Sequence, residues 1–458
     1  MRDIEQFFKA YDIRGSVEAG LDGQFAYGLG LALGQKFRPK NCILGHDARL
    51  SSPDLAVSLA RGLANCGHDI TCAGLCGTEE IYYAAAFEGF DLGVMVTGSH
   101  NPIGENGFKV VGPGAVPIDA SNGLMDICHN MQLNCHLESN NPGRLRKRNY
   151  RDNYVDWLLR YTGYGSDKKP GQVARPLRIV VDAGNGCAGP MLDALRPFLP
   201  VEFIGLDLEP DGNFPNGIPN PLLPEMRHKT SAAVRASDAD LGIAFDGDFD
   251  RCFFFDNEGN LVESCYLVGL LATELLALYP GQKIVHDPRV YWCTRELVIR
   301  AGGECIMGKG GHSNMKAAMR AADALYGGEM SAHHFYRDFA YCDSGMLTML
   351  LVIGVLLRTG KSIGELTEAS RTNWPCSGEK NFRLKDAQSI LDRIWDKYAP
   401  QAVHADRLDG INLEFENWRF NLRSSNTEPL VRLNIEARQS RQVLQERLEE
   451  LEAILGGC

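Results

Sequence analysis

Short apolar segments that end abruptly in small polar residues recur along this chain, and they restrict its possible folds more than any other feature. Each is typical of a buried strand that leads into a loop of Gly, Asp, Ser or Asn. The segments are residues 43–44, 92–96, 178–181, 241–245 and 283–285. Amphipathic helices follow, as where Leu55, Leu59 and Leu63 share one helical face after Ser51-Ser52-Pro53. The alternation predicts repeated α/β units with largely parallel sheets.

The C-terminal part of the chain has a different pattern. A polar stretch at 364–373 and the pair Trp374-Pro375 come first. We then expect a helix over 387–398, strands over 411–415, 418–422 and 430–435, and a last helix over 441–455. This order is typical of a separate, smaller α+β domain. Because 458 residues are too many for one core, we expect three α/β domains and one α+β domain, at 1–148, 149–255, 256–367 and 368–458.

Composition argues against several classes of function. A net charge of −11 disfavours a general nucleic-acid binder and a polybasic membrane-surface protein. The longest apolar run, 346–357, is shorter than the roughly 20 residues of a membrane span, so we expect a buried helix there. The 14 cysteines form no C-x-x-C pair, which favours reduced, mostly buried thiols. With the acidic start over residues 1–6, these features predict a cytoplasmic protein without nucleic-acid or membrane partners.

The segment 92–102 places a serine hydroxyl at the end of an apolar strand. Leu92–Val96 is followed by Gly98, Ser99 and His100, and Pro102 prevents a simple continuation of the strand. Open α/β sheets bind their ligands at the carboxyl ends of strands. Ser99 is therefore a candidate to carry a phosphoryl group. The alternative is a turn whose Ser and Asn side chains only satisfy their own backbone.

Three carboxylates follow the strand predicted at 241–245. Asp246, Asp248 and Asp250 can converge on one hard cation, and Mg²⁺ is bound by few carboxylates together with phosphate oxygens. A calcium EF-hand is excluded, because Arg251 and Asn257 stand where that loop needs Gly and Glu. Arg251 could neutralise part of the charge or hold a substrate phosphate. A solvated acidic turn is the alternative, although three carboxylates repel one another without a cation.

Further candidates lie in other polar loops. Arg14 precedes a glycine and has the planar fork that fits phosphate oxygens. His312 is carried on the glycine-rich loop 308–312, and Glu329 and Ser331 follow a short strand at about 326–328. The segment 423–429 between two predicted strands has the composition of an anion-binding loop. Its candidates, with Arg432, are Arg423, Ser425, Asn426 and Thr427. In each place a surface turn is the alternative.

Four motifs in chain order resemble the α-D-phosphohexomutase family over essentially the whole chain. They are Ser99-His-Asn-Pro102, Asp246-Gly-Asp-Phe-Asp-Arg251, Gly327-Gly-Glu-Met-Ser331 and Arg423-Ser-Ser-Asn-Thr427. Tyr11-Asp-Ile-Arg14-Gly, Gly77-Thr-Glu-Glu80 and Asn216–Pro221 strengthen the resemblance. It implies four domains around a central cleft, three of them α/β with mixed sheets, and phosphoryl transfer between two positions of a hexose phosphate. Resemblance alone favours mannose over glucose or glucosamine phosphate.

The resemblance also implies roles for the candidate residues. Ser99 would be the phosphoserine, and its phosphate would bind Mg²⁺ with Asp246, Asp248 and Asp250. Lys109 and His312 would be the acid and base, and Arg14 would clamp the phosphoryl group. The implied substrate contacts are Tyr11, Arg251, Arg289, Glu329, Ser331, Arg423, Ser425, Asn426, Thr427 and Arg432. A hexose 1,6-bisphosphate would be the activator, and we expect a monomer or a weak homodimer.

Three residues depart from the family pattern, and two other functions remain open. Gly98 stands where Ala is usual, Glu105 where Tyr is usual, and Gly310 where a hydroxyl residue is common. We expect the two glycines to loosen their loops and Glu105 to add negative charge near a phosphate. One rival function is a phosphatase with Asp246 as nucleophile and Asp248 as acid/base. The other is a non-catalytic sugar-phosphate sensor.

Overall fold

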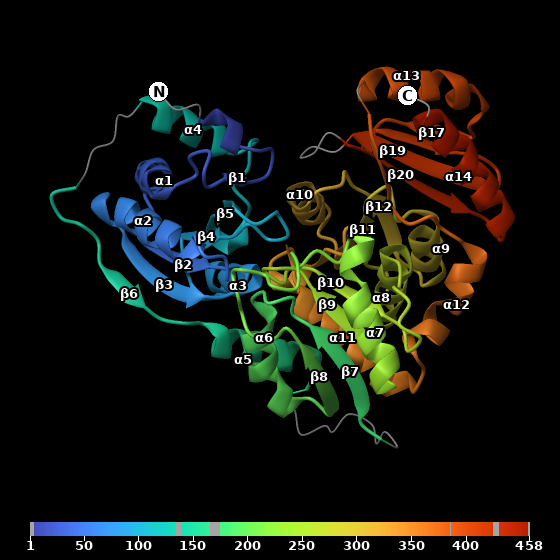
Figure 1. The fold of residues 1–458 in the computed structure, drawn as a ribbon, viewed down its shortest axis with the longest axis horizontal. Helices are drawn as coiled ribbons and strands as arrows, with labels where there is room; N and C mark the ends of the chain where they lie inside the picture. The colour runs from blue at the N-terminus through green and yellow to red at the C-terminus, as the bar shows by residue number, and fades with distance from the viewer. Residues whose placement is uncertain (1–3, 134–138, 165–174, 385, 425–429, 457–458) are drawn as a thin grey trace. The chain divides into compact units, whose positions relative to one another are not determined.

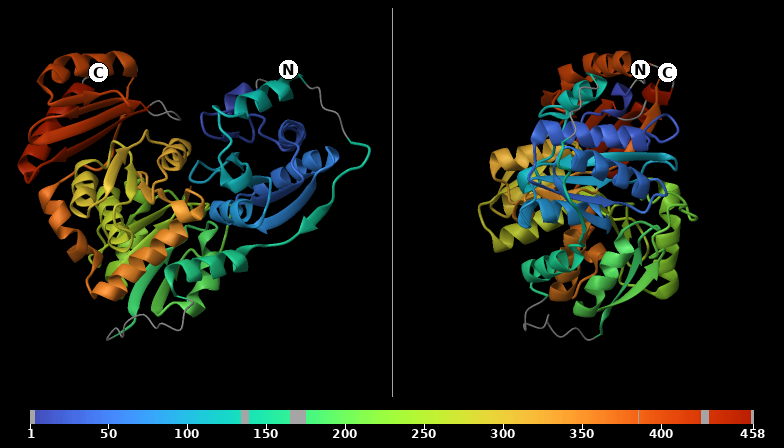
Figure 2. Two further views of the ribbon diagram at one scale, coloured as in Figure 1. Left: turned by 180° about the vertical axis from the view of Figure 1, so that it is seen from behind. Right: turned by 90° about the vertical axis from the view of Figure 1, so that its left-hand side faces the viewer.

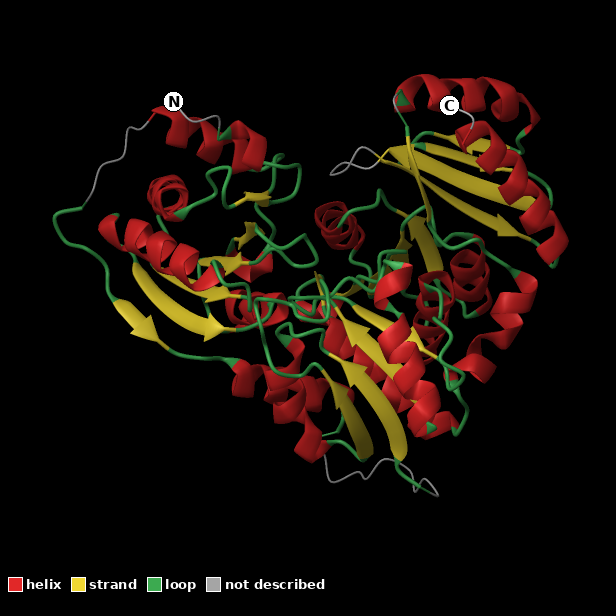
Figure 3. Cartoon of the chain, viewed as in Figure 1, coloured by secondary structure: helices red, strands yellow, loops and turns green. Residues whose placement is uncertain are grey.

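The computed structural model describes residues 4–133, 139–164, 175–384, 386–424 and 430–456. Contacts within the chain divide it into two units. Unit 1 contains residues 1–261 and 338–362, and unit 2 contains residues 262–337 and 363–458. Helices and strands alternate through most of both units (Figure 3).

The first sheet of unit 1 has six strands in the order β1-β5-β4-β2-β3-β6 (Figure 1). They are β1 (Ile13–Ser16), β2 (Asn41–His46), β3 (Asp69–Leu75), β4 (Leu92–Val96), β5 (Glu105–Val111) and β6 (Leu145–Lys147). β5 runs antiparallel to β1 and β4, whereas β2 is parallel to β3 and β4. The helices α1 (Gly23–Phe37), α2 (Ser52–Asn65) and α4 (Leu124–Leu133) pack on one face and α3 (Thr78–Phe87) on the other.

The second sheet of unit 1 has the order β10-β9-β7-β8. Its strands are β7 (Leu177–Asp182), β8 (Val201–Leu206), β9 (Leu241–Phe245) and β10 (Cys252–Phe255). The unit also contains α5 (Arg151–Thr162), α6 (Ala188–Leu195), α7 (His228–Ser237), β15 (Cys342–Asp343) and α11 (Gly345–Thr359). Most of α11 is buried, which confirms the buried helix predicted over 346–357.

One buried carboxylate joins three of these helices. Glu79, in the first turn of α3, accepts hydrogen bonds from the amides of Gly345 (2.9 Å) and Met346 (3.1 Å) at the start of α11. It also accepts from the hydroxyls of Ser344 and, from α5, Tyr154. Burial raises the pKa of Glu79 well above its usual range, although the bonds from Ser344, Tyr154 and Met346 oppose that shift. The carboxylate thus satisfies amides that no turn of α11 could satisfy.

Glu79→Ala should destabilise the protein by about 3 kcal/mol or more, because it leaves several buried donors without an acceptor. The urea midpoint, followed by circular dichroism, measures the effect. Glu18→Ala, in an exposed turn of the same unit, is the control and should change the free energy of unfolding by less than about 0.5 kcal/mol. Equal midpoints for the two variants would show that Glu79 does not hold α11.

Unit 2 contains two groups of strands. In the first, β12 (Glu304–Met307), β11 (Lys283–His286), β13 (Tyr326–Gly328) and β14 (His334–Tyr336) are neighbours in that order. The helices α8 (Ser264–Leu278), α9 (Trp292–Arg300), α10 (His312–Ala322) and α12 (Ile363–Asn373) accompany them.

The second group is an antiparallel sheet in the order β16-β20-β19-β18-β17. Its strands are β16 (Lys380–Arg383), β17 (His404–Asp406), β18 (Ile411–Glu414), β19 (Trp418–Ser424) and β20 (Leu430–Ala437). α13 (Ala387–Tyr398) and α14 (Arg441–Gly456) share one apolar core with this sheet and cover one of its faces (Figure 2).

The predicted fold class, three α/β domains with mixed sheets and a smaller α+β domain, is confirmed. The strands 92–96 and 241–245 and the helix 387–398 have the predicted bounds. Two details were not predicted: β5 begins after the Ser99 loop and runs antiparallel to β4, and the polar stretch 364–373 lies in the helix α12. Among the described residues, no single helix is long and apolar enough to cross a membrane. The bent pair α11 and α12 together reaches the length and apolar composition of a membrane span.

Candidate active site

Ser99 lies in the short connection between the antiparallel neighbours β4 and β5. Its backbone has a φ of +48°, a left-handed conformation that costs a non-glycine residue of order 1 kcal/mol. The Ser99 amide donates to the Thr97 hydroxyl at 2.7 Å, which holds this turn. Ser99 is buried, and its Oγ donates to Oδ2 of Asp246 at 2.8 Å. The strained turn therefore aims the hydroxyl at the acidic loop.

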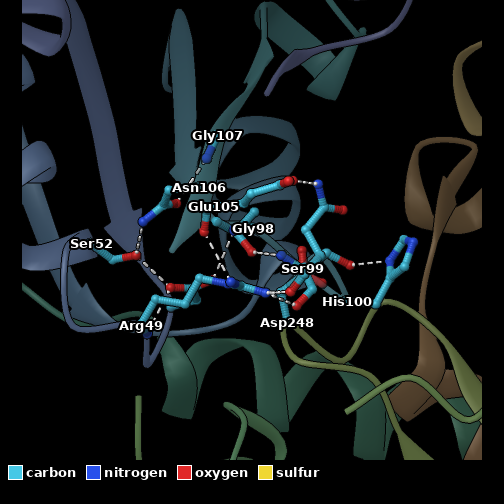
Figure 4. Close-up of polar contacts among 12 residues, drawn as sticks. Arg49, Ser52, Gly98, Ser99, His100, Glu105, Asn106, Gly107 and Asp248 are labelled. Atoms are coloured by element: carbon cyan, nitrogen blue, oxygen red, sulfur yellow. Dashed lines mark hydrogen bonds and ion pairs between the residues drawn. The ribbon is translucent and has the colours of Figure 1, made fainter. Parts of the chain in front are cut away.

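One buried arginine binds the backbone of the Ser99 loop from below (Figure 4). Arg49 Nη2 donates to the carbonyl oxygens of Ser99 (2.9 Å) and Asn101 (2.5 Å). Its Nη1 donates to those of Pro102 (2.8 Å) and Glu105 (2.9 Å). Four carbonyl groups thus share one guanidinium. This role was not predicted; the available signal in the sequence was an arginine in a polar loop just after the strand β2.

Gly98 gives that guanidinium its space. A Cβ on Gly98 would overlap the Arg49 side chain, and the Gly98 amide donates to Oδ2 of Asp47 at 3.1 Å. Glu105 uses its carboxylate to accept from Asn101 Nδ2 at 2.8 Å. The missing side chain of Gly98 thus leaves room for contacts of Arg49 and Asp47 with the loop backbone; the effect of Gly98 on the mobility of the loop stays a prediction.

The three aspartates occupy the loop between β9 and β10, and all are buried. One oxygen from each of Asp246, Asp248 and Asp250 lies within 4.8 Å of the others. Within the described residues, Asp248 Oδ1 is buried without a hydrogen-bond partner. Arg251 forms an ion pair with Asp246, Nη2 to Oδ2 at 2.8 Å, and also contacts His100 Nδ1. The predicted carboxylate cluster is therefore present next to Ser99, with one oxygen that could bind a cation.

Lys109 brings a compensating charge from β5. Its Nζ lies 2.7 Å from Asp248 Oδ2 and 2.5 Å from Asp250 Oδ2. Thr78, at the start of α3, donates to the same Asp248 oxygen at 2.5 Å. Burial lowers the pKa of Lys109, but the two carboxylates outweigh burial and raise it overall. Lys109 is therefore an ammonium at neutral pH.

Arg14 and His100 complete the group around Ser99. Arg14, on β1, donates from Nη1 to the Gly98 carbonyl at 2.8 Å and to Asn101 Oδ1 at 3.2 Å. His100 Nδ1 lies 3.1 Å from Ser99 Oγ. Burial and the charges of Arg251 and Arg14 lower the pKa of His100 well below its usual range, so its ring is neutral. Tyr11, half-buried, lies two residues before β1.

In unit 2, the candidates Glu329 and Ser331 follow β13 as predicted. The Glu329 carboxylate accepts from the Gly311 amide at 2.5 Å and from Ser331 Oγ at 3.3 Å, and lies 3.0 Å from His333 Nδ1. Arg289 Nη2 lies 3.9 Å from it. The structure therefore brings Glu329, Ser331 and Arg289 together, with a glycine-rich loop against the carboxylate.

Glu329 makes the stability of unit 2 depend on pH in the acid range. Burial alone would raise its pKa, but the bond and charge of His333, the charge of Arg289 and the Gly311 amide lower it from 4.5 to about 2. A carboxyl whose pKa is lower in the folded state stabilises the fold above pH 4.5 and loses that contribution as the pH falls toward 2.

Glu329→Gln should therefore flatten the loss of stability between pH 4.5 and 2, by roughly 3 kcal/mol for this shift. Urea unfolding at a series of pH values measures the slope. Glu304→Gln, on an exposed position of β12, is the matched control and should keep the wild-type slope. A Glu329→Gln slope equal to that of the wild type would contradict the assignment.

His312 and Gly310 differ from their predicted setting. His312 is not carried within a loop: it is the first residue of α10, preceded by Gly311 with a φ of +110°. The Gly310 amide donates to Oδ2 of Asp409, from the β17–β18 connection, at 3.2 Å. A Cβ on Gly310 would lie 2.8 Å from that oxygen. Gly310 thus permits a close contact, contrary to the expectation of a looser loop.

The predicted anion-binding loop is only partly described. Ser425, Asn426 and Thr427 lie outside the described residues. Arg423 is not in a loop: it lies in β19, directly opposite Arg432 of β20. These two like charges are compensated by carboxylates: Arg423 Nη1 lies 3.8 Å from Asp409 Oδ2, and Arg432 Nη1 lies 3.4 Å from Glu379 Oε1. Arg289 Nη1 lies 2.8 Å from the other oxygen of Glu379. Three guanidinium groups, those of Arg289, Arg423 and Arg432, thus lie near the two carboxylates of Glu379 and Asp409, a charge pattern suited to an anion.

Comparison with known proteins covers the whole chain. Domain models of the family "Phosphoglucomutase/phosphomannomutase" match residues 5–132 (alpha/beta/alpha domain I), 152–259 (domain II), 264–373 (domain III) and 379–454 (C-terminal domain). Relatives named phosphomannomutase from Salmonella montevideo and Escherichia coli are each 47% identical over 455 residues, with 98% of both chains covered. A relative named phosphohexose mutases, from Xanthomonas campestris, is 47% identical over 450 residues, covering 98% of this chain and 99% of its own.

Solved structures agree with these matches. A Burkholderia thailandensis protein of the phosphoglucomutase/phosphomannomutase family has a TM-score of 0.87 and 32% identity, covering 100% of this chain and 98% of its own. An N-acetylphosphoglucosamine mutase from Aspergillus fumigatus, solved with GlcNAc-6P and magnesium, has a TM-score of 0.59 and 14% identity, with 99% and 97% covered. The second likeness concerns the fold alone.

Proposed function

We propose, on the premise that this chain belongs to the phosphoglucomutase/phosphomannomutase family, that it interconverts mannose 6-phosphate and mannose 1-phosphate. The observation that carries the proposal is the buried Ser99 hydroxyl, which donates to Asp246 beside two further buried aspartates. Relatives at 47% identity that are named phosphomannomutase support the choice of mannose. Phosphoglucomutase or phosphoglucosamine mutase activity is the alternative within the family.

Ser99 would carry the phosphoryl group between the two ends of the sugar. Phosphoserine gives its phosphoryl group to the free hydroxyl of the hexose monophosphate, which yields a hexose 1,6-bisphosphate. The Ser99 oxygen then accepts the other phosphoryl group, and the isomeric monophosphate leaves. A hexose 1,6-bisphosphate would therefore also activate unphosphorylated enzyme. Such transfer depends on positioning and on neutralising the −1.5 to −2 charge of the phosphate.

The residues around Ser99 suit that charge. Asp246, Asp248 and Asp250 would hold Mg²⁺ together with a phosphate oxygen on Ser99, and hard oxygen donors such as the unpartnered Asp248 Oδ1 fit this ion. Bound there, Mg²⁺ would supply positive charge to the phosphoryl oxygens. Lys109 and Arg14 would add fixed positive charge from the same sheet.

Proton transfer is assigned to Lys109 and His312. Because its pKa is raised, Lys109 is protonated and cannot accept a proton while it contacts Asp248 and Asp250. The same contacts weaken it as an acid, so we expect them to be released before it donates a proton. Glu329 and Ser331 would hold sugar hydroxyls. Phosphate contacts would come from Tyr11, Arg251, Arg289, Arg423, Ser425, Asn426, Thr427 and Arg432.

Intact-protein and peptide mass analysis after incubation with a hexose 1,6-bisphosphate tests the proposal. We expect one phosphate per chain, on Ser99. A stoichiometric phosphate on another residue, or none, would reject the mechanism. Coupled assays with mannose 1-phosphate, glucose 1-phosphate and glucosamine 1-phosphate side by side then rank the substrates, and the highest kcat/KM with mannose is expected.

We also propose the domain bounds 1–148, 149–255, 256–367 and 368–458, a cytoplasmic location, and a monomer or weak homodimer. Limited proteolysis should cleave near these bounds first, since linkers expose their backbone. Size-exclusion chromatography with light scattering over a range of protein concentrations measures the mass of the assembly.

A further inference from the structure

Two cysteine side chains meet where α8 contacts the segment that leads into β16. Cys265 Sγ, in the first turn of α8, lies 3.3 Å from Cys376 Sγ. Both are free thiols; Cys265 is buried and Cys376 is half-buried. A disulfide bond is about 2.05 Å long, so roughly 1 Å of movement would bring the two sulfur atoms to bonding distance.

The segment 374–378 is held against α8 on both sides of Cys376. Tyr266 donates its hydroxyl to the Trp374 carbonyl at 3.0 Å. On the other side, a Cβ on Gly378 would lie 3.3 Å from Glu263 Oε1. Packing before and after Cys376 therefore fixes the backbone that carries its sulfur atom next to α8.

The same segment is also paired with the antiparallel sheet. Cys376 forms a β-bridge with Glu436, and the Ser377 amide donates to the Ile435 carbonyl at 3.0 Å. The Ala437 amide donates to the Pro375 carbonyl at 2.9 Å. Cys376 therefore contacts both β20, with which it is paired, and α8, which carries Cys265. A bond between the two sulfur atoms would tie the sheet to the helix.

We propose that Cys265 and Cys376 form a reversible disulfide when the protein meets a hydroperoxide, and that this cross-link lowers turnover by fixing the C-terminal sheet to α8. The second half rests on the proposed function, in which β19 and β20 carry Arg423 and Arg432 and must grip and release a phosphate in every cycle. Motions of this kind often limit kcat.

The chemistry balances with hydrogen peroxide as the oxidant. The thiolate of Cys376, the more exposed sulfur, attacks one peroxide oxygen; the O–O bond breaks, and a sulfenic acid and water form. The Cys265 sulfur then attacks the Cys376 sulfur, and a second water leaves with the sulfenic oxygen. Two thiol hydrogens are lost, two electrons pass to the peroxide, and a dithiol reductant reverses the result.

Peptide mapping of the full-length protein after hydrogen peroxide treatment tests the cross-link. We expect a peptide pair that joins Cys265 to Cys376, a loss of two titratable thiols and a mass lower by two hydrogens, all reversed by dithiothreitol. Cys376→Ser should show none of these changes. Cys305→Ser, which replaces another half-buried cysteine of unit 2, is the matched control and should keep the cross-link.

A different disulfide, or oxidation of Cys376 beyond the sulfenic acid with Cys265 still reduced, would overturn the proposal. In the cross-linked protein we expect a lower kcat that dithiothreitol restores, with no such loss in Cys376→Ser. An undiminished kcat in fully cross-linked protein would overturn the proposal that the disulfide lowers turnover. If the fully reduced protein shows no mutase activity at all, the proposed function fails, whereas the peptide map still decides the cross-link.

Discussion

Ser99→Ala is expected to lower kcat by roughly 10⁴-fold or more and to abolish phosphate incorporation from a hexose 1,6-bisphosphate. The variant removes the oxygen that accepts the phosphoryl group. The turn should be kept, because backbone hydrogen bonds hold Ser99: its amide donates to the Thr97 hydroxyl, and its carbonyl accepts from Arg49. Activity should therefore fall while the thermal unfolding midpoint stays near that of the wild type. A coupled mutase assay and intact-protein mass measure the two effects.

Ser121→Ala, in an exposed turn of unit 1, is the control and should keep full activity. The rival phosphatase mechanism predicts the reverse pattern: Ser99→Ala stays active, and Asp246→Asn loses all activity with no phosphoserine at any stage. In our proposal Asp246→Asn still has the Ser99 oxygen, so slow phosphorylation of Ser99 should remain detectable. An active Ser99→Ala variant would therefore exclude the mutase mechanism.

The parts of the site that could be predicted are those encoded within a few residues. The apolar run at 92–96 fixed the strand bounds, because all five residues of β4 are buried. Three aspartates within five residues can converge in a tight loop, and one oxygen of each lies within 4.8 Å of the others. The Ser99 and Asp246 loops could be paired only through the family resemblance, since 147 positions separate the two residues.

Contacts between side chains and backbone atoms could not be predicted from the sequence. Arg49 binds carbonyl oxygens, and every residue has one, so no pattern in the sequence marks its partners. Gly98 and Gly310 were interpreted as sources of flexibility because their sequence context does not show which side chain approaches them. The approaching groups, Arg49 and Asp409, come from elements about 50 and 100 positions away. The role of both glycines is to leave room for a side chain that lies close to the backbone.

In unit 2, local polarity and charge did not predict the helix α12 or the position of Arg423 in a strand. The polar stretch 364–373 forms α12, whose Ile363 and Thr367 face the interior while its charged residues face water. Arg423 was placed in a turn because its neighbours are small and polar. Its position in β19 opposite Arg432 is tolerated because Asp409 and Glu379 compensate the two charges. Tertiary neighbours thus outweighed local composition.

Removing divalent metal with a chelator should lower kcat by on the order of 10³-fold, and Asp248→Asn should cause a comparable loss that added Mg²⁺ restores only in part. Asp248 is central because one of its oxygens accepts from Thr78 and Lys109 while the other, buried, has no partner among the described residues. Burial opposes ionisation, but Lys109, Thr78 and Arg14 lower the pKa of Asp248, so the carboxylate is charged at every working pH. An amide at this position removes the charge that a cation needs.

Asp182→Asn is the matched control, since Asp182 is also a buried aspartate at the end of a strand of the same sheet. Its carboxylate is already satisfied by the Thr230 hydroxyl and the Gly184 amide, each at 2.9 Å. We expect Asp182→Asn to change stability but to keep the wild-type dependence of kcat on Mg²⁺. Asp248→Asn should instead shift that dependence to higher Mg²⁺, in addition to the loss of stability that follows from removing a charge that faces Lys109. A chelator-resistant wild type, or equal Mg²⁺ curves for the two variants, would mean that the aspartate loop serves only to hold Lys109 and Arg251.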